Sequence, residues 1–172
     1  MDDVNEQDGT GLSHVDAAGA SRMVDVSGKA VTRRTAVAEG RVVVSDLLAA
    51  AISSNTLKKG DLLATARLAG VVAAKRTDEL IPLCHSLPLE HVGVEAELAD
   101  GHVMLRATAT TTAKTGVEME AYTAVMVAAL TVIDMGKAVD PAMRVEGVRL
   151  VSKTGGSKGD YHAEANAGGG DV

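Results

Sequence analysis

Two carboxylates on one apolar segment are the side chains whose spacing most clearly suggests chemistry. Glu120 and Asp134 lie 14 residues apart, and residues 124–133 between them are almost entirely apolar. A helix would place both on one face but about 21 Å apart, at 1.5 Å per residue. Carboxylates serve as general acids and bases, but two groups so far apart cannot act on the same bond. A shared site would require this helix to meet a different end of a neighbouring subunit.

The charges at the ends of this segment also have an ordinary explanation. The negative charges of Glu118 and Glu120 would interact favourably with the positive N-terminal end of the helix dipole. Asp134 and Lys137 are spaced for an i,i+3 surface ion pair. A helix that is apolar all round is buried on every side, so we expect it to contact another subunit as well as its own sheet. Spacing alone leaves both explanations open.

A loop between two prolines carries the second candidate group, Leu83, Cys84 and His85. The prolines exclude a continuous helix, and rigid loops often carry site residues. The five histidines show no zinc spacing and Cys84 is the sole cysteine, so we expect no metal site. A Cys84–His85 catalytic dyad is disfavoured, because adjacent side chains rarely point at each other. A loop that is merely anchored by proline and leucine remains an alternative.

Lysines at the ends of expected elements form the third group: Lys59, Lys75, Lys137 and Lys153. Each alone is ordinary compensation of a helix dipole, whereas several lysines converging on a cleft would bind phosphate. The sequence has neither a Walker A motif nor G-x-G-x-x-G. A nucleotide would therefore have to be held by side chains.

Hydrophobic periodicity and turn residues predict the strands that position these groups. We expect a strand from Val31 to Val44 with a bulge at Gly40, and a last strand over about Gly147 to Lys153. Between them, two alternating runs over residues 92–98 and 103–109 flank Asp100-Gly101, a dipeptide suited to a tight hairpin turn.

Capping residues and breakers predict three helices. The first begins after Ser45, the second runs from Asp61 to about Lys75–Thr77, and the third spans Gly116 to Ala138. The resulting order is β, two helices, β, β, helix, β. This is the ferredoxin-like split βαβ pattern, so the predicted class is α+β, an antiparallel sheet with helices packed on one face.

Domain organisation follows from the distribution of residues able to form a core. We expect a single domain over residues 12–154, a disordered N-terminus over 1–11 and a flexible Gly-rich tail over 155–172.

Composition disfavours several classes of protein. Two of the 172 residues are aromatic and the formal net charge is −6, which disfavours nucleic-acid binding by base stacking. The apolar stretch over residues 121–133 is shorter than the roughly 20 residues that span a bilayer, and the N-terminus has no signal-peptide pattern. With a lone cysteine, these features predict a cytoplasmic protein that binds neither nucleic acid nor membrane.

Six runs follow one another in a fixed order between about Leu12 and Glu164: Met23-Val24-Asp25-Val26-Ser27, Lys59-Gly60-Asp61 with Ala64-Thr65-Ala66-Arg67, Ala73-Ala74-Lys75-Arg76-Thr77, Ile81-Pro82-Leu83-Cys84-His85, Lys114-Thr115-Gly116-Val117-Glu118-Met119-Glu120-Ala121, and Asp134-Met135 with Lys137-Ala138-Val139. Together these runs resemble the MoaC family of molybdenum cofactor biosynthesis, whose members are cyclic pyranopterin monophosphate synthases.

The resemblance implies a lyase built on a ferredoxin-like subunit. Its substrate would be 3′,8-cyclo-7,8-dihydroguanosine 5′-triphosphate, supplied by a preceding radical enzyme, and its products cyclic pyranopterin monophosphate and pyrophosphate. The subunits would form a homohexamer, a trimer of dimers, with active sites at subunit interfaces. Because the reaction involves no redox change, we expect no cofactor.

The resemblance also implies roles for individual residues. Asp134 would be the acid/base residue, and Lys59 and Lys137 the essential lysines. The residues lining the substrate site would be Leu83, Cys84, His85, Met119 and Glu120. Supporting polar members would be Asp25, Glu118 and Lys153.

A ferredoxin-like regulatory module that binds a small molecule is the alternative function. It would share the sheet and the oligomer, but it would not need Lys59, His85, Asp134 and Lys137 together. An RNA-binding domain of similar topology is disfavoured by the charge and by the missing aromatic platform.

Overall fold

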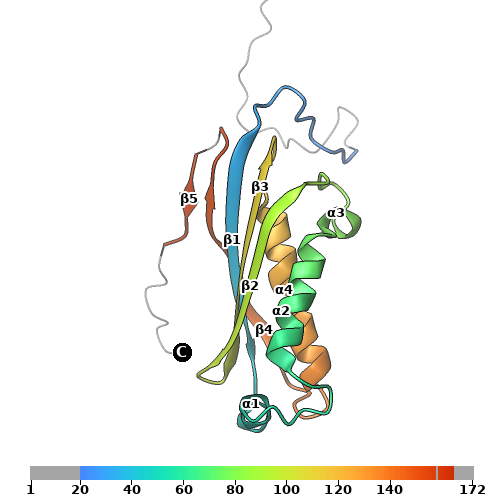
Figure 1. The fold of residues 1–172 in the computed structure, drawn as a ribbon, viewed down its shortest axis with the longest axis vertical. Helices are drawn as coiled ribbons and strands as arrows, with labels where there is room; N and C mark the ends of the chain where they lie inside the picture. The colour runs from blue at the N-terminus through green and yellow to red at the C-terminus, as the bar shows by residue number, and fades with distance from the viewer. Residues whose placement is uncertain (1–19, 158, 165–172) are drawn as a thin grey trace, which may run out of the picture.

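A single antiparallel sheet forms one layer of the subunit (Figure 1). The computed structural model describes residues 20–157 and 159–164, so the expected disordered segment 1–11 lies outside the described residues. The strand order is β2-β3-β1-β4-β5. The strands are β1 (Thr32–Val43), β2 (Leu89–Ala99), β3 (His102–Ala113), β4 (Arg144–Thr154) and β5 (Tyr161–His162).

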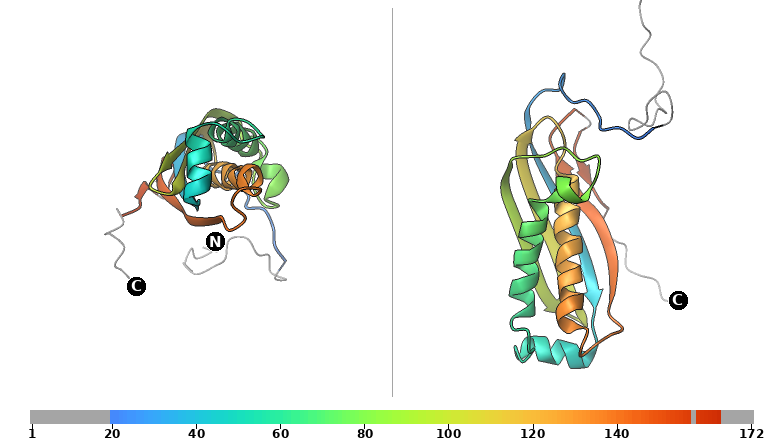
Figure 2. Two further views of the ribbon diagram at one scale, coloured as in Figure 1. Left: turned by 90° about the horizontal axis from the view of Figure 1, so that it is seen from below. Right: turned by 90° about the vertical axis from the view of Figure 1, so that its right-hand side faces the viewer.

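The helices form the second layer, on one face of the sheet (Figures 1 and 2). They are α1 (Asp46–Ser53), α2 (Leu62–Ala74), α3 (Thr77–Leu80) and α4 (Glu118–Gly136). Helices α2 and α4 lie side by side along the sheet, and α1 lies across one end of the layer. The predicted α+β class with a ferredoxin-like arrangement is confirmed.

Local capping explains where two of the helices begin. Ser45 accepts a hydrogen bond from the Leu48 amide at the start of α1, and Asp61 accepts one from the Ala64 amide at the start of α2. These side chains satisfy amides that lack a partner within the helix. Both predicted helix starts are confirmed.

The predicted hairpin is also present, between β2 and β3. Asp100 and Gly101 have φ values of 47° and 73°, which a two-residue turn of type I′ requires. The turn sets the register Ala99↔His102, and the pairing then extends to Leu89↔Thr111.

The core lies between the sheet and the α2–α4 pair and is built from small side chains. Ala36, Ala38 and Val42 alternate along β1 with outward-facing residues and are fully buried. A Cβ on Gly70 of α2 would lie 2.8 Å from the Ala124 carbonyl oxygen of α4. The two helices therefore approach closely because one of them carries a glycine at the contact.

Gly40 is the centre of an irregularity in the sheet, but the extra residue belongs to β4. Pairing of β1 with β3 continues through Gly40↔Leu105, whereas Glu39 pairs with Arg149 and Arg41 with Glu146 on β4. A Cβ on Gly40 would lie 2.9 Å from Cγ2 of Val148. The glycine predicted to form the bulge instead makes room for the bulged strand.

Two short elements were not predicted from the sequence. The one-turn helix α3 precedes the proline-flanked loop, and β5 pairs Tyr161 with Lys153 and His162 with Ser152 of β4. Strand β5 lies within residues 155–172, for which the sequence predicts a flexible tail. Neither element is long enough to show a periodic pattern.

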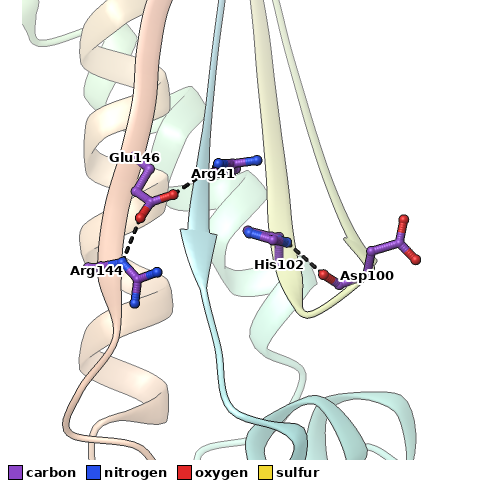
Figure 3. A network of polar contacts seen from close by, with 5 residues as sticks. All are labelled: Arg41, Asp100, His102, Arg144 and Glu146. Carbon is purple, nitrogen blue, oxygen red and sulfur yellow. Dashed lines mark hydrogen bonds and ion pairs between the residues drawn. The ribbon is translucent and has the colours of Figure 1, made fainter. Parts of the chain in front are cut away.

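The sheet face opposite the helices is polar. Glu146 of β4 lies between Arg41 of β1, at 3.0 Å, and Arg144, at 2.5 Å (Figure 3). Such side chains suit a solvent-facing surface, because exposed ion pairs are stable in water but contribute little to folding. The core therefore lies on the other face of the sheet, the face that the helices cover.

Helix α4 is the central core element. By length and composition it could cross a membrane, but 56% of its most apolar 18-residue window is buried inside the subunit. Burial on that scale is typical of a core helix in a globular protein.

Candidate active site

The two ends of α4 carry different sets of the predicted site residues. Its first turn carries Glu118, Met119 and Glu120, and its last turn carries Asp134. The helix runs the length of the sheet, so these sets lie at opposite ends of the subunit (Figure 2). We call the set around Asp134 the lysine–aspartate cluster and the cavity around Glu120 the pocket.

The lysine–aspartate cluster consists of Lys59, Asp134 and Lys137. Lys59 Nζ lies 2.6 Å from Oδ2 of Asp134 and donates also to its backbone carbonyl, while Lys137 Nζ lies 2.7 Å from Oδ1. Hydrogen bonds from Lys137 and Lys59 lower the pKa of Asp134 to about 2. The cluster is exposed to solvent and holds one carboxylate between two ammonium groups.

Two local features place Lys59 beside Asp134. Lys59 lies in the turn between α1 and α2, where Gly60 adopts a φ of 89° and donates to the Leu57 carbonyl. The buried Asp140, just beyond α4, accepts a hydrogen bond of 2.7 Å from the Ser45 amide at the start of α1. Asp140 thereby joins the chain after α4 to the start of α1, the helix that leads to the turn carrying Lys59, and sequence reasoning missed this contact.

The pocket, a cavity of about 410 Å³, lies at the opposite end. Its walls contain seven of the predicted site residues: Leu83, Cys84, His85, Glu118, Met119, Glu120 and Lys153. They come from the proline-flanked loop, the first turn of α4 and the end of β4. The structure therefore brings this part of the predicted site together and leaves the lysine–aspartate cluster apart from it.

Glu120 is the most deeply buried carboxyl in the pocket, with 3% of its surface exposed. Its Oε2 has no hydrogen-bond partner among the described residues. Burial, with additional repulsion from Glu118 and Asp78, raises its pKa to about 7. Glu120 is thus poised to exchange a proton near neutral pH.

The neighbouring groups differ from Glu120. Glu118 accepts a 2.9 Å hydrogen bond from Lys153 Nζ, so its charge is balanced. Burial raises the pKa of the Cys84 thiol, and the Glu120 and Asp78 carboxylates act in the same direction. A raised pKa keeps Cys84 a neutral thiol, which suits a pocket wall better than a nucleophile.

Residues 23–29, which we call the strap, contribute to the pocket wall. His85 hydrogen-bonds to the strap, and Asp25 belongs to it. Nε2 of His85 lies 2.9 Å from the Val24 carbonyl oxygen, so this nitrogen carries a proton and donates it. Asp25 accepts from the Ser27 amide and does not line the pocket, unlike its neighbours Val24 and Val26. The structure therefore places Asp25 in the turn of the strap.

Three basic residues in the pocket wall were missed by sequence reasoning: Lys29, Arg34 and Lys114. Arg34 donates to the carbonyls of Ala113 and Lys114. A signal for Arg34 existed, because it shares the strand parity of the buried Ala36 and Ala38 and must point toward the helices. Lys29 and Lys114 lie in irregular segments, where no periodic signal exists.

No group of three or more His, Cys, Asp or Glu side chains able to hold a metal ion occurs among residues 20–157 and 159–164. The cavity instead combines carboxyl groups with lysine and arginine side chains. Such a set can bind an anionic ligand and transfer protons.

Comparison with known proteins identifies the family. The family model described as "MoaC family" matches residues 23–156, which include the strap, the lysine–aspartate cluster and all the predicted site residues of the pocket. The chain belongs to the MoaC family.

Relatives of this MoaC-family chain are similar over most of their length. A protein of Chloroflexus aggregans named cyclic pyranopterin monophosphate synthase is 54% identical over 91% of this chain and 96% of its own. Proteins of the same name from Streptomyces avermitilis and Nocardioides sp. are 57% and 56% identical, each over 87% of this chain and over 88% and 94% of their own.

Proposed function

We propose that this MoaC-family chain is a cyclic pyranopterin monophosphate synthase. It would convert 3′,8-cyclo-7,8-dihydroguanosine 5′-triphosphate to cyclic pyranopterin monophosphate and pyrophosphate, an early step of molybdenum cofactor biosynthesis. The relatives with this name, 54–57% identical over 87–91% of the chain, support the assignment. The structural observation that carries it is the lysine–aspartate cluster, in which two lysines contact one carboxylate.

The cluster suits a reaction that moves protons on a triphosphate. Asp134 has a pKa of about 2 and is therefore a carboxylate at neutral pH, too weakly basic for efficient proton transfer while both lysines bind it. Substrate phosphates would compete for Lys59 and Lys137. Drawing the lysines away would raise the pKa of Asp134 and make it a better base.

The lysines would also serve the departure of pyrophosphate. Closing the cyclic phosphate forms a bond from a sugar hydroxyl oxygen to the α-phosphorus and breaks the bond from that phosphorus to the β-phosphate oxygen. Ammonium groups held near the leaving pyrophosphate stabilise its developing charge. We assign this role to Lys59 and Lys137, with Lys153 as a supporting cation in the pocket.

The substrate would bind in the pocket. Leu83, Met119 and the stem of Cys84 would contact the fused ring, and His85, Glu118 and Glu120 would provide polar contacts to it. Asp25 supports this site indirectly, through the turn of the strap.

A complete site then requires two subunits. Glu120 and Asp134 are 14 residues apart on α4, or about 21 Å, which is too far for one reacting centre. We therefore propose that the pocket of one subunit meets the lysine–aspartate cluster of its neighbour in a homohexamer built as a trimer of dimers. Exposed apolar side chains on the outer face of the helical layer support self-association: Leu68, Val72, Met126 and Leu130.

The proposed setting is the cytoplasm, with a small molecule as the partner and no nucleic acid or membrane bound. The formal net charge of −6 argues against attraction to polyanions.

Turnover by the purified protein tests the proposed function. Incubation with the cyclised GTP derivative should yield cyclic pyranopterin monophosphate, identified by mass spectrometry, and one equivalent of pyrophosphate. The oligomer should have six subunits in analytical ultracentrifugation. Absence of product from freshly prepared substrate would overturn the proposal.

A further inference from the structure

The strap, residues 23–29, forms one wall of the pocket without being part of a helix or strand. It lies at the end of the sheet where β1 begins (Figure 1). Val24 and Val26 are half-buried and line the cavity, whereas Asp25 and Ser27 between them are exposed. The strap therefore has an inner face that a ligand would touch.

Two side chains from the pocket hold the strap in place. Nε2 of His85 donates to the Val24 carbonyl at 2.9 Å, and Lys114 Nζ donates to the Ser27 carbonyl at 2.6 Å. Among the described residues, these are the hydrogen bonds that join the strap to the rest of the subunit. The contact made by Lys114 is charge-assisted and therefore the stronger kind.

The strap has its own internal turn. Asp25 Oδ1 accepts from the Ser27 amide at 2.8 Å, and the Lys29 amide donates to the Val26 carbonyl at 3.0 Å. The Ser27 amide, Lys114 and Arg22 all favour the charged form of Asp25 and lower its pKa. Because this turn makes the strap one unit, fixing the Ser27 carbonyl also fixes the position of Lys29.

Lys29 is the cation that the strap brings to the pocket. It lines the cavity together with Arg34 and Lys153, and no described carboxylate is paired with it. Lys153, in contrast, is paired with Glu118. An unpaired ammonium group at the rim of a cavity is suited to bind a phosphate group of a ligand.

We propose that Lys114 is a positioning residue that holds the strap over the pocket, and that the strap thereby presents Lys29 to the phosphates of the substrate. The identity of the anion rests on the proposed function. The attachment of the strap through the Ser27 carbonyl does not.

A double-mutant cycle tests whether Lys114 acts through Lys29. Lys114→Met and Lys29→Met should each raise KM for the cyclised substrate about tenfold, because each loses one charge-assisted contact. KM should change more than kcat in both variants. If Lys114 acts through Lys29, the double variant should be no worse than the single ones. An additive, roughly hundredfold increase would show that Lys114 binds substrate independently and would overturn the proposal.

Two matched variants separate positioning from general damage. Lys114→Arg can still donate to the Ser27 carbonyl and should keep KM within about threefold of wild type. Arg106→Met removes an exposed cation of β3 that pairs with Glu39, outside the pocket, and should leave KM unchanged. A tenfold rise in KM in Lys114→Arg, or in Arg106→Met, would contradict the role assigned to Lys114.

Hydrogen exchange tests the strap without relying on the reaction. The intact oligomer is labelled in deuterated water and then digested for mass spectrometry. The backbone amides of a peptide covering residues 23–29 should exchange at least about tenfold faster in Lys114→Met than in wild type. Lys29→Met and Arg106→Met should exchange like wild type. Equal exchange in all variants would refute the attachment even if wild type is active, whereas a wild-type enzyme without turnover would refute the proposed function alone.

Discussion

The two ends of α4 place similar carboxyl groups in opposite environments. Asp134 is exposed, contacts two lysines and has a pKa of about 2, whereas Glu120 is buried, has no hydrogen-bond partner for its Oε2 among the described residues and has a pKa of about 7. Divergent pKa values in one pair of carboxyls commonly separate an acid from a base. Here one helix produces both environments, because one of its ends reaches solvent and the other closes a cavity.

The contrast extends to charge balance. The lysine–aspartate cluster has two cations for one exposed carboxylate, while the Glu118 and Asp78 carboxylates beside the buried Glu120 disfavour its charged form. The cluster therefore offers a charged carboxylate between two ammonium groups, and the pocket offers a carboxyl group that can be neutral. This complementarity is what a site shared between neighbouring subunits would use.

The largest effect is expected at the exposed end. Asp134→Asn keeps the size of the side chain but removes the proton acceptor, and kcat should fall about 10²- to 10⁴-fold, the usual contribution of a general acid or base. Steady-state release of pyrophosphate measures it. The oligomer should persist, because the substitution keeps the size of the side chain and leaves unchanged the exposed apolar residues that support self-association.

A matched variant controls for the general effect of neutralising an exposed aspartate. Asp46→Asn alters an exposed aspartate in the first turn of α1, outside the cluster, and should retain wild-type turnover. Activity of Asp134→Asn within a few-fold of wild type would remove the catalytic role assigned to the exposed end.

Mixing two inactive variants tests whether the ends come from different subunits. Co-expressed Asp134→Asn and His85→Ala subunits should form dimers in which one site has both wild-type ends, restoring about a quarter of the wild-type rate. Activity per site in purified mixed oligomers measures this. The gain over either parent should approach two orders of magnitude.

The corresponding control uses two variants of the same end. Asp134→Asn with Lys59→Ala leaves every site with a damaged lysine–aspartate cluster, so this mixture should stay inactive. Recovery in neither mixture would mean that each site is built within one subunit. Recovery in both would mean that the Asp134 and Lys59 used by one site come from different subunits, against their contact within the subunit.

The sequence predicted what local rules determine. Ser45 and Asp61 cap helices whose starts follow from side-chain chemistry within three residues, and Asp100-Gly101 requires only a turn of two residues. The 14-residue spacing of Glu120 and Asp134 also predicted that they lie at opposite ends. Each of these inferences depends only on residues within one helix or one turn.

Contacts between distant segments could not be predicted in this way. Lys59 and Asp134 are 75 residues apart in the chain, and Lys114 and Ser27 are 87 apart. Their pairing depends on how α4 lies on the sheet and on the path of irregular segments, for which hydrophobic periodicity has no signal. The resemblance indicated Lys59 and Asp134 and included Lys114 in one of its runs without a role, but neither it nor the spacing indicated Lys29 or Arg34.

Stability measured against pH tests the buried end. The pKa of Glu120 is about 7 in the folded protein against an ordinary 4.5, so the unfolded chain releases the proton first. Wild type should therefore lose stability as pH rises from about 4.5 to 7, and keep that loss above pH 7. Glu120→Gln lacks this titration, and its stability relative to wild type should increase by about 2 kcal/mol between pH 5 and pH 8.

Chemical denaturation at each pH measures that difference. The other titratable groups near Glu120 include Glu118, Asp78 and Cys84, with His85 and Lys153 in the same pocket wall, and they are unchanged in the variant. A difference that stays constant with pH would show that Glu120 is charged in the assembled protein. In that case cations of a neighbouring subunit would already compensate it, and the contrast between the ends would disappear on assembly.

Two glycines with similar backbone angles provide the smallest test of the comparison. Gly60, beside Lys59, has a φ of 89° and open space around its Cα, whereas Gly155, close to Lys153, has a φ of 85° and faces the Arg33 carbonyl. Gly60→Ala should lower stability by about 1 kcal/mol, the cost of a left-handed alanine. Gly155→Ala adds a clash, because its Cβ would lie 2.1 Å from that carbonyl oxygen, and should cost about 1 kcal/mol more.

Because the crowded glycine borders the pocket, Gly155→Ala should also raise KM through displacement of Lys153. Equal losses of stability in the two variants would show that the loop after β4 moves freely and that the pocket end is no more tightly built than the exposed end.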